Sequence, residues 1–289
     1  MDTFVLYCKS YRNDVLRARV LAESVARFNR EGLTFYISAP EADLPLFREK
    51  LEGLSVTLIA DEEILSANPR HSVKLMEELS GGLMQQIVKS EFWRLKLCKN
   101  YLMLDSDCYF IRDFGIADFM LDPDTPYTVM HEGKDLLEFA ARKGMKKIRE
   151  HYVKDRVKAQ SFFNRPGRHY NYGPIPTICS AAVWESLANN YAEPRNLSFA
   201  DLIGLSPGEM LWYGEAILAY APIRLVPIEP LFKVFHYKEQ YEESVALGVT
   251  EAVLAEDYLG VIRQSNWDRE LDLVPKKRRT WRTLWLKRR

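Results

Sequence analysis

Hydrophobic residues in the first part of the chain follow two alternating patterns. Short continuous apolar runs, typical of buried strands, lie at 3–8, 33–39 and 54–60. Between them, apolar residues recur every three or four positions from 12 to 32 and from 40 to 53, which predicts helices with one buried face. Strands that alternate with helices predict an α/β fold: a mainly parallel, twisted, Rossmann-like sheet with helices on both faces.

The alternation continues for one more helix and strand and then becomes less regular. A helix is predicted at 81–98 and a strand at 101–107. Because no repeat or low-complexity linker follows, we expect one domain with an elaborated C-terminal half. Its predicted elements are strands at 127–133, 177–180, 223–229 and 232–237, a charged amphipathic stretch at 134–163, a loop at 164–176, and helices at 181–190 and 206–221.

Charge is unevenly distributed, although the formal net charge is zero. Residues 276–289 carry eight Lys and Arg and no acid, which leaves 32 basic against 40 acidic residues in the rest of the chain. Trp281 and Trp285 stand one helical turn apart in this basic tail, a composition that favours binding to an anionic membrane surface. The acidic body disfavours nucleic acid as a partner. A disordered charged end is the alternative.

The four cysteines are far apart, with no pair at zinc-finger or redox-motif spacing. They are expected to be buried thiols in a reducing compartment. The N-terminus lacks the pattern of a secretion signal, and no apolar run approaches the ~20 residues that cross a bilayer. These features predict a cytoplasmic protein, held peripherally at the inner face of the cell membrane by its tail.

Two carboxylates directly follow the apolar run 101–104. Ligands of open parallel sheets bind beyond the carboxyl ends of the strands, where Asp105 and Asp107 would lie. In an extended segment both side chains point the same way, with Ser106 opposite, and a divalent cation would offset their repulsion. Mg²⁺ or Mn²⁺ held by two carboxylates keeps positions open for a diphosphate. A polar turn after a strand is the alternative.

Several segments in order resemble nucleotide-sugar glycosyltransferases of the GT-A fold, most closely bacterial glycosyltransferase-like proteins of surface-polysaccharide synthesis. The resemblance covers about 3–241. It rests on "QQIVKSEFWRL" before the acidic strand, "YLMLDSDCYFIRDF" with its DxD motif, and later "GPIPTICSAAVWESL", "GEMLWYGEAIL" and "VFHY". It implies a catalytic domain at 1–275, with a nucleotide-binding half at 1–114 and an acceptor-side half at 115–275.

The resemblance also implies a reaction. A sugar would pass from a nucleoside-diphosphate sugar, UDP type being expected, to a glycan or lipid-linked acceptor, with Mn²⁺ or Mg²⁺ required. Asp105, Asp107 and His236 would hold the metal, although a histidine in this apolar context is also typical of a core residue. The donor would contact Lys9, Ser10, Tyr11, Arg12, Gln86, Lys89, Asp105, Ser106 and Lys238, with Gln85 on the same helix face as Lys89.

An inverting transferase needs a general base. Glu209 is the candidate, with Glu215 as the second choice, and Trp212 and Tyr213 could form an aromatic sugar platform. A glutamate that stabilises the start of its helix would explain Glu209 equally well. Asp14 could contact the nucleotide or cap the first long helix. The loop 164–176 is basic and aromatic; it could bind an anionic acceptor or be an ordinary exposed loop.

Two other functions use similar residues. Phosphotransferases of the haloacid-dehalogenase type also place two Asp at i and i+2 after a strand, but their pattern lies near the N-terminus and continues with a residue that Tyr109 does not match. A non-catalytic sugar- or lipid-binding scaffold is the second alternative. The chain contains no P-loop, no G-x-G-x-x-G and no H-E-x-x-H motif, so the corresponding enzyme classes have no support.

Overall fold

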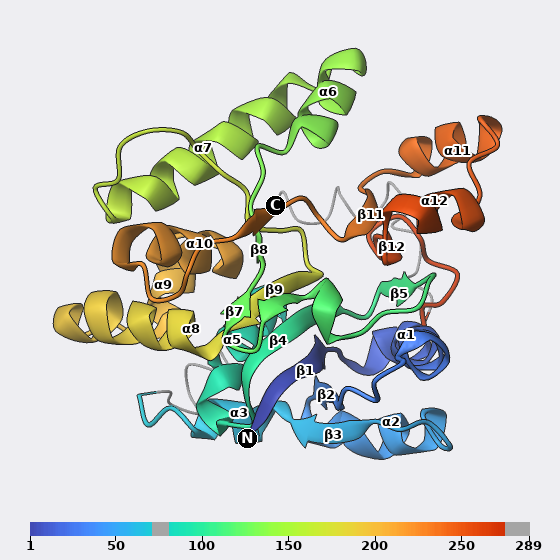
Figure 1. The fold of residues 1–289 in the computed structure, drawn as a ribbon, viewed down its shortest axis with the longest axis horizontal. Helices are drawn as coiled ribbons and strands as arrows, with labels where there is room; N and C mark the ends of the chain where they lie inside the picture. Colours follow the sequence, from blue (N-terminus) through green and yellow to red (C-terminus); the bar gives the residue numbers. More distant parts are fainter. Residues whose placement is uncertain (71–80, 275–289) are drawn as a thin grey trace, which may run out of the picture.

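The central sheet has five strands in the order β3-β2-β1-β4-β9 (Figure 1). A computed structural model describes residues 1–70 and 81–274 of the chain. The strands β1, β2, β3 and β4 run parallel, and β9 pairs antiparallel with β4. The predicted α/β fold with a mainly parallel sheet is therefore confirmed. The strand bounds are Asp2–Lys9 (β1), Phe35–Ala39 (β2), Thr57–Ala60 (β3), Cys98–Asp105 (β4) and Thr177–Ser180 (β9).

Helices cover both faces of the sheet because side chains alternate along its strands. Tyr7 and Met103 belong to one hydrophobic cluster, and Leu6 and Leu104 to the other. The first cluster contains residues of α3 (Asp61–Ser66), α5 (Gly81–Glu91), α8 (Ala181–Leu187), α9 (Phe199–Leu205) and α10 (Glu209–Tyr220), and the second contains residues of α1 (Val15–Phe28) and α2 (Leu44–Lys50).

Several predicted elements differ from the observed ones, among them the strand predicted at 223–229, of which only Pro227–Ile228 is a strand. The α-helix predicted at 81–98 ends at Glu91 and continues as a 3-10 helix over Phe92–Leu95. Lys96, with a left-handed φ of 54°, ends this helical segment, and Cys98 already pairs with β1. The charged stretch 134–163 forms two helices, since Gly144 breaks it with a φ of 66°. The strand predicted at 127–133 is only two residues long. The elements are α6 (Lys134–Arg142), α7 (Lys146–Phe162), and β8 (Thr128–Val129) paired with β10 (Pro227–Ile228).

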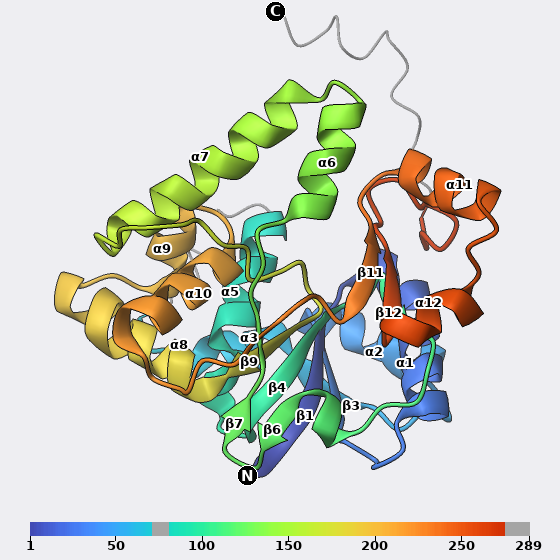
Figure 2. The same cartoon turned by 45° about the horizontal axis from the view of Figure 1, so that its top comes forward.

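A second, three-stranded sheet lies beside the carboxyl end of β4. Its order is β11-β12-β5, and it carries α11 and α12. The sequence pattern predicted no strand at β12, because four residues are too few to show a period. Figure 2 shows α6 and α7 on one side and this sheet with α11 on the other side. Both groups lie above the ends of the central strands. The bounds are β5 (Cys108–Phe110), β6 (Met120–Asp122), β7 (Thr125–Pro126), β11 (Phe232–Phe235), α11 (Lys238–Ala246), α12 (Glu251–Asp257) and β12 (Gly260–Arg263).

All four cysteines are buried free thiols, as predicted. Among the described residues, no helix has the length and apolar character of a membrane span. The basic tail 276–289, with its predicted membrane contact, lies outside the described residues.

Candidate active site

A cavity of about 310 Å³ lies at the carboxyl end of β4. Its walls come from α5, from the turn after β4, from the start of α10 and from the segment that follows β12. The structure thus brings together residues that are up to 184 positions apart in the sequence, from Gly82 to Asn266. Six of the side chains considered in the sequence line this one cavity: Gln85, Gln86, Lys89, Asp105, Asp107 and Glu209.

Asp105 is held by two side chains of α5. As the last residue of β4 it faces the same side of the sheet as Met103, where α5 packs. Lys89 Nζ forms an ion pair with Asp105 Oδ1, and Gln85 Nε2 donates to the same oxygen at 3.0 Å. Gln85 and Lys89 are one helical turn apart, so they share a face, as the sequence predicted.

Lys89 is a buried cation, with only 2% of its side chain exposed. Burial by itself would lower the pKa of Lys89, but the charges of Asp105 and Glu209 outweigh that effect and raise the pKa. Its amine lies 3.8 Å from Glu209 Oε1. One positive charge is therefore shared between carboxylates from two different elements of the cavity.

Asp107 reaches the cavity through a turn, where the sequence predicted an extended strand. Ser106 and Asp107 form this turn between β4 and β5. Asp107 Oδ2 accepts a hydrogen bond from the backbone N–H of Ser265 at 2.8 Å. Burial and the neighbouring charge of Asp105 raise the pKa of Asp107 to about 6, against the opposing effect of the Ser265 hydrogen bond. Ser106 is buried and does not line the cavity.

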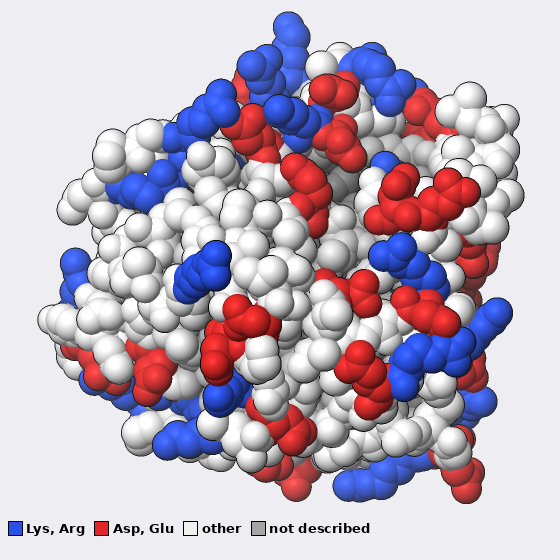
Figure 3. Space-filling view, viewed as in Figure 1, with Lys and Arg blue, Asp and Glu red and all other residues white. Residues whose placement is uncertain are grey.

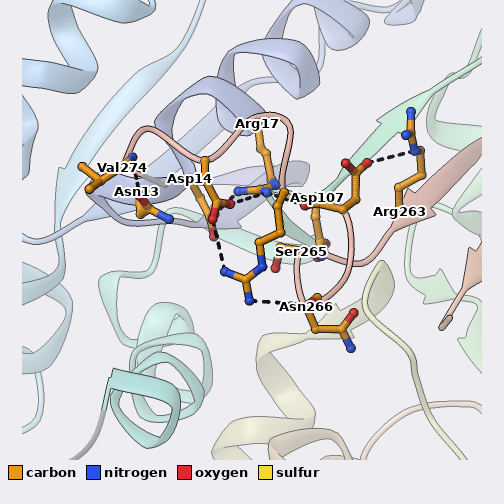
Figure 4. A network of polar contacts seen from close by, with 11 residues as sticks. Asn13, Asp14, Arg17, Asp107, Arg263, Ser265, Asn266 and Val274 are labelled. Atoms are coloured by element: carbon orange, nitrogen blue, oxygen red, sulfur yellow. Dashed lines mark hydrogen bonds and ion pairs between the residues drawn. The ribbon is translucent and has the colours of Figure 1, made fainter. Parts of the chain in front are cut away.

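Ser265 belongs to a C-terminal segment that is anchored on α1 (Figure 4). The buried guanidinium of Arg17 binds Asp14 Oδ1 and Asp272 Oδ1, both at 2.5 Å. Asp14 occupies the N-cap position of α1, one of the two alternatives from the sequence, but its side chain makes no capping hydrogen bond and binds Arg17 instead. No sequence signal pointed to Ser265, because a backbone N–H acts regardless of residue type.

Glu209 is the first residue of α10, and its position is fixed by α5. Gln86 Oε1 accepts a hydrogen bond from the N–H of Gly208 at 2.7 Å, at the start of the helix. Burial raises the pKa of Glu209, and the charge of Lys89 opposes the shift. A carboxylate with a raised pKa is better suited to accept a proton near neutral pH.

Glu215, the second candidate base, is part of a buried ion pair. Arg165 Nε and Nη2 bind its two oxygens at 2.6 and 2.9 Å, and its side chain is only 2% exposed. The hydroxyl of Tyr172 lies 3.4 Å from the same carboxylate. The geometry therefore assigns Glu215 and Arg165 to the packing of α10 against the loop 164–176.

The predicted aromatic platform is wrong, because both rings belong to the core. Trp212 is 1% exposed, and its Nε1 donates to the carbonyl of Ser206 at 2.9 Å. Tyr213 is 2% exposed, and its hydroxyl accepts from the N–H of Ser180 at 2.6 Å. Helix α10 is apolar almost all round, so neighbouring aromatic residues are used for packing.

The four predicted donor contacts at the end of β1 do not line this cavity. Lys9 forms a buried ion pair with Asp61 at 2.8 Å. The Ser10 hydroxyl is buried, with no hydrogen-bond partner among the described residues. Tyr11 is exposed, and the exposed side chain of Arg12 binds Asp43 at 3.0 Å. Their contacts with a nucleotide stay predictions.

His236 and Lys238 lie outside the small cavity. His236 lines a larger cleft of about 1160 Å³ between α6, α7 and the β11–α11 region. Burial lowers the pKa of His236 to about 4, and its Nδ1 lies 3.4 Å from Gln264 Nε2. Lys238 is exposed and pairs with Glu242 at 3.1 Å. The two cavities meet at Pro174, which lines both.

The donor atoms of the small cavity fit a metal ion that needs few protein ligands. Within residues 1–70 and 81–274, no three or more His, Cys, Asp or Glu side chains are grouped as a metal site, so the predicted set with His236 is not assembled. Asp105 and Asp107 each have one oxygen without a hydrogen bond from the described residues. Mg²⁺ binds through one or two carboxylates plus water and phosphate oxygens, which this pair can satisfy.

Comparisons with known proteins give a family and distant similarities to solved structures. No curated protein matches the chain. A solved structure, the apo form of mouse xyloside xylosyltransferase 1, is similar at 11% identity and a TM-score of 0.47, over 94% of this chain and 99% of that chain. A similarity at this level says nothing about reaction or substrate. The family model described as a family of unknown function, DUF6492, matches residues 4–271, and the chain therefore belongs to that family.

Proposed function

We propose that this protein is a metal-dependent glycosyltransferase that moves a sugar from a nucleoside-diphosphate sugar, UDP type being expected, to a glycan or lipid-linked acceptor. One observation carries the proposal: Asp105, Asp107 and Glu209 line one small cavity at the carboxyl end of a parallel sheet, beside a larger cleft. Open α/β sheets bind their ligands at this edge.

Each side chain of the cavity has a role in this reaction. Asp105 and Asp107 would hold Mg²⁺ or Mn²⁺, which, when bound, neutralises the charge of a departing diphosphate. Lys89 and Gln85 hold the Asp105 carboxylate in place through an ion pair and a hydrogen bond. In an inverting reaction, Glu209 would take the proton of the acceptor hydroxyl. Gln86 positions Glu209 through the first turn of α10.

The larger cleft would hold the acceptor, since it meets the small cavity at Pro174. Surface-polysaccharide synthesis on the cytoplasmic side of a bacterial membrane is the setting that we propose. The basic tail 276–289 would bring the protein to the anionic leaflet, where lipid-linked acceptors lie.

Calorimetry with UDP and GDP, with and without Mn²⁺, tests the proposal. The wild-type protein is expected to bind one of them only when the metal is present. Asp107→Ala should abolish that binding, while the control Asp113→Ala, at an exposed carboxylate paired with Arg30, should retain it. Absence of metal-dependent binding of either nucleotide would overturn the proposal. Hydrolysis of small phosphate esters without nucleotide binding would favour a phosphotransferase.

A further inference from the structure

The charged side chains of the larger cleft are mostly paired with one another. Figure 3 shows acidic and basic side chains side by side on the face where α6 and α7 stand opposite α11. Such exposed pairs leave little net charge for a ligand. The pairs are Arg168 with Glu132 at 2.6 Å, Lys134 with Glu132 at 3.5 Å, Arg142 with Glu243 at 3.7 Å, and Lys233 with Asp135 at 3.8 Å.

Arg156 of α7 differs from these residues. Its guanidinium lies on the ring of Tyr152, 3.3 Å from the ring centroid. Nη1 donates to the Tyr152 carbonyl at 2.9 Å, and Nη2 donates to Asn171 Oδ1 at 2.6 Å. Nε is buried without an acceptor, and no described carboxylate forms an ion pair with Arg156. Its partners are therefore neutral, while its positive charge is retained.

These contacts hold the guanidinium of Arg156 in an orientation that suits an anionic ligand. Burial lowers the pKa of Arg156 and outweighs the opposing charge of Asp155, which forms no ion pair with it. Arginine stays charged in proteins, and its planar fork matches the two oxygens of a carboxylate or phosphate. The contacts with Tyr152 and Asn171 fix the plane of the fork before any ligand binds.

We propose that Arg156 binds an anionic group, a carboxylate or a phosphate, of the acceptor in the larger cleft. The identification of the ligand as the acceptor rests on the proposed function, whereas the anion site itself rests on the contacts of Arg156 in the cleft. The loop 164–176, for which binding of an anionic acceptor was one of two alternatives from the sequence, has no arginine without an acidic partner. Arg165 is bound by Glu215, and Arg168 by Glu132.

Binding of three related sugars tests the site. Glucuronate, glucose 6-phosphate and glucose are titrated separately into the full-length protein at low salt and followed by NMR. At least one acidic sugar is expected to bind about tenfold to a hundredfold more tightly than glucose, because a charge-assisted bidentate contact is added. Whichever acidic sugar binds identifies the anionic group.

Two variants of Arg156 test whether this residue causes the preference for an acidic sugar. Arg156→Gln should lose the preference for the acidic sugar, and Arg156→Lys, which keeps the charge without the fork, should retain part of it. The matched control Arg142→Gln removes an exposed arginine that lines the same cleft, and it should bind like the wild type. Thermal unfolding of each variant shows whether it is folded.

Equal binding of all three sugars by the wild type would overturn the anion site, as would a preference that survives in folded Arg156→Gln. The measurement is independent of the donor, since Arg156 does not line the small cavity. UDP binding in the presence of Mn²⁺ should be unchanged in Arg156→Gln. Failure of the wild type to bind any nucleotide would overturn the proposed function and leave the anion measurement valid.

Discussion

The small cavity and the large cleft differ in how far their charged side chains are exposed to water. In the small cavity the charges are buried and in contact: Lys89 lies between Asp105 and Glu209 with only 2% of its side chain exposed. In the large cleft they form pairs near water, as Arg142 does with 66% of its side chain exposed. Charges interact strongly where water is excluded and weakly where it is not. The small cavity is therefore suited to chemistry and the large cleft to recognition.

The largest expected effects come from substituting two buried glutamates of α10, one of which should change the rate and the other the stability. Glu209→Gln should lower the transfer rate by roughly 10²–10⁴-fold, because a general base is lost, and change the free energy of unfolding by less than about 1 kcal/mol. Glu215→Gln should lower the free energy of unfolding by about 3 kcal/mol, since it leaves Arg165 without its bidentate partner. Transfer assays and urea unfolding measure both. A rate unchanged in Glu209→Gln would remove the base assignment.

Lys89→Met tests whether the buried cation holds the small cavity together. The variant leaves Asp105 and Glu209 facing each other without a counter-charge, and it is expected to lose about 3 kcal/mol of stability. Lys50→Met, at a surface lysine paired with Glu49, should change stability by less than about 0.5 kcal/mol. Equal unfolding free energies for the two variants would contradict the contrast between buried and exposed charge.

Asp107 should make the small cavity sensitive to pH. Its pKa is raised to about 6 in the folded protein, so the folded state favours its protonated form. The stability that this group contributes is fully present below its ordinary pKa and is lost as pH rises through about 6, by on the order of 3 kcal/mol. Affinity for Mn²⁺ should follow the opposite trend and fall below pH 6, because protons compete with the metal.

Urea unfolding and Mn²⁺ titration between pH 4 and 8 measure these trends. Asp107→Asn provides the control for stability, since it removes the titrating group while keeping a hydrogen-bond acceptor for Ser265. The pH dependence of unfolding between 4 and 7 should be flatter in this variant. An unchanged profile would assign the dependence to other carboxylates.

Gln86→Ala should have the smallest effect. It removes the acceptor for the N–H of Gly208 at the start of α10, which is expected to cost about 1 kcal/mol of stability. The transfer rate should fall while the affinity for nucleotide stays the same, because Gln86 acts through the position of Glu209. Gln85→Ala is the informative comparison: it releases Asp105, so metal-dependent nucleotide binding should weaken instead. Weaker nucleotide binding in Gln86→Ala would assign that side chain to the donor.

Local pattern was sufficient for the first half of the fold. Continuous apolar runs and helical spacing predicted β1 to β4 and the helices α1, α2 and α5, because each side chain there faces one side of the sheet or one side of a helix. The short helix α3 was not predicted. The acidic pair was also placed correctly at the end of a strand. The pattern was less informative after Phe110, where strands of two to four residues pair with distant segments, as β12 does with β5 and β11.

The sequence by itself determined the alternation of strands and helices, the carboxylates at the end of β4, and the shared face of Gln85 and Lys89, since these depend on spacing along one element. Only the tertiary structure decided which charges meet. It placed Glu209 beside Lys89 and the N–H of Ser265 on Asp107, paired Glu215 with Arg165, and left Arg156 without an acid. These outcomes depend on distances between elements far apart in the chain, which no local spacing encodes.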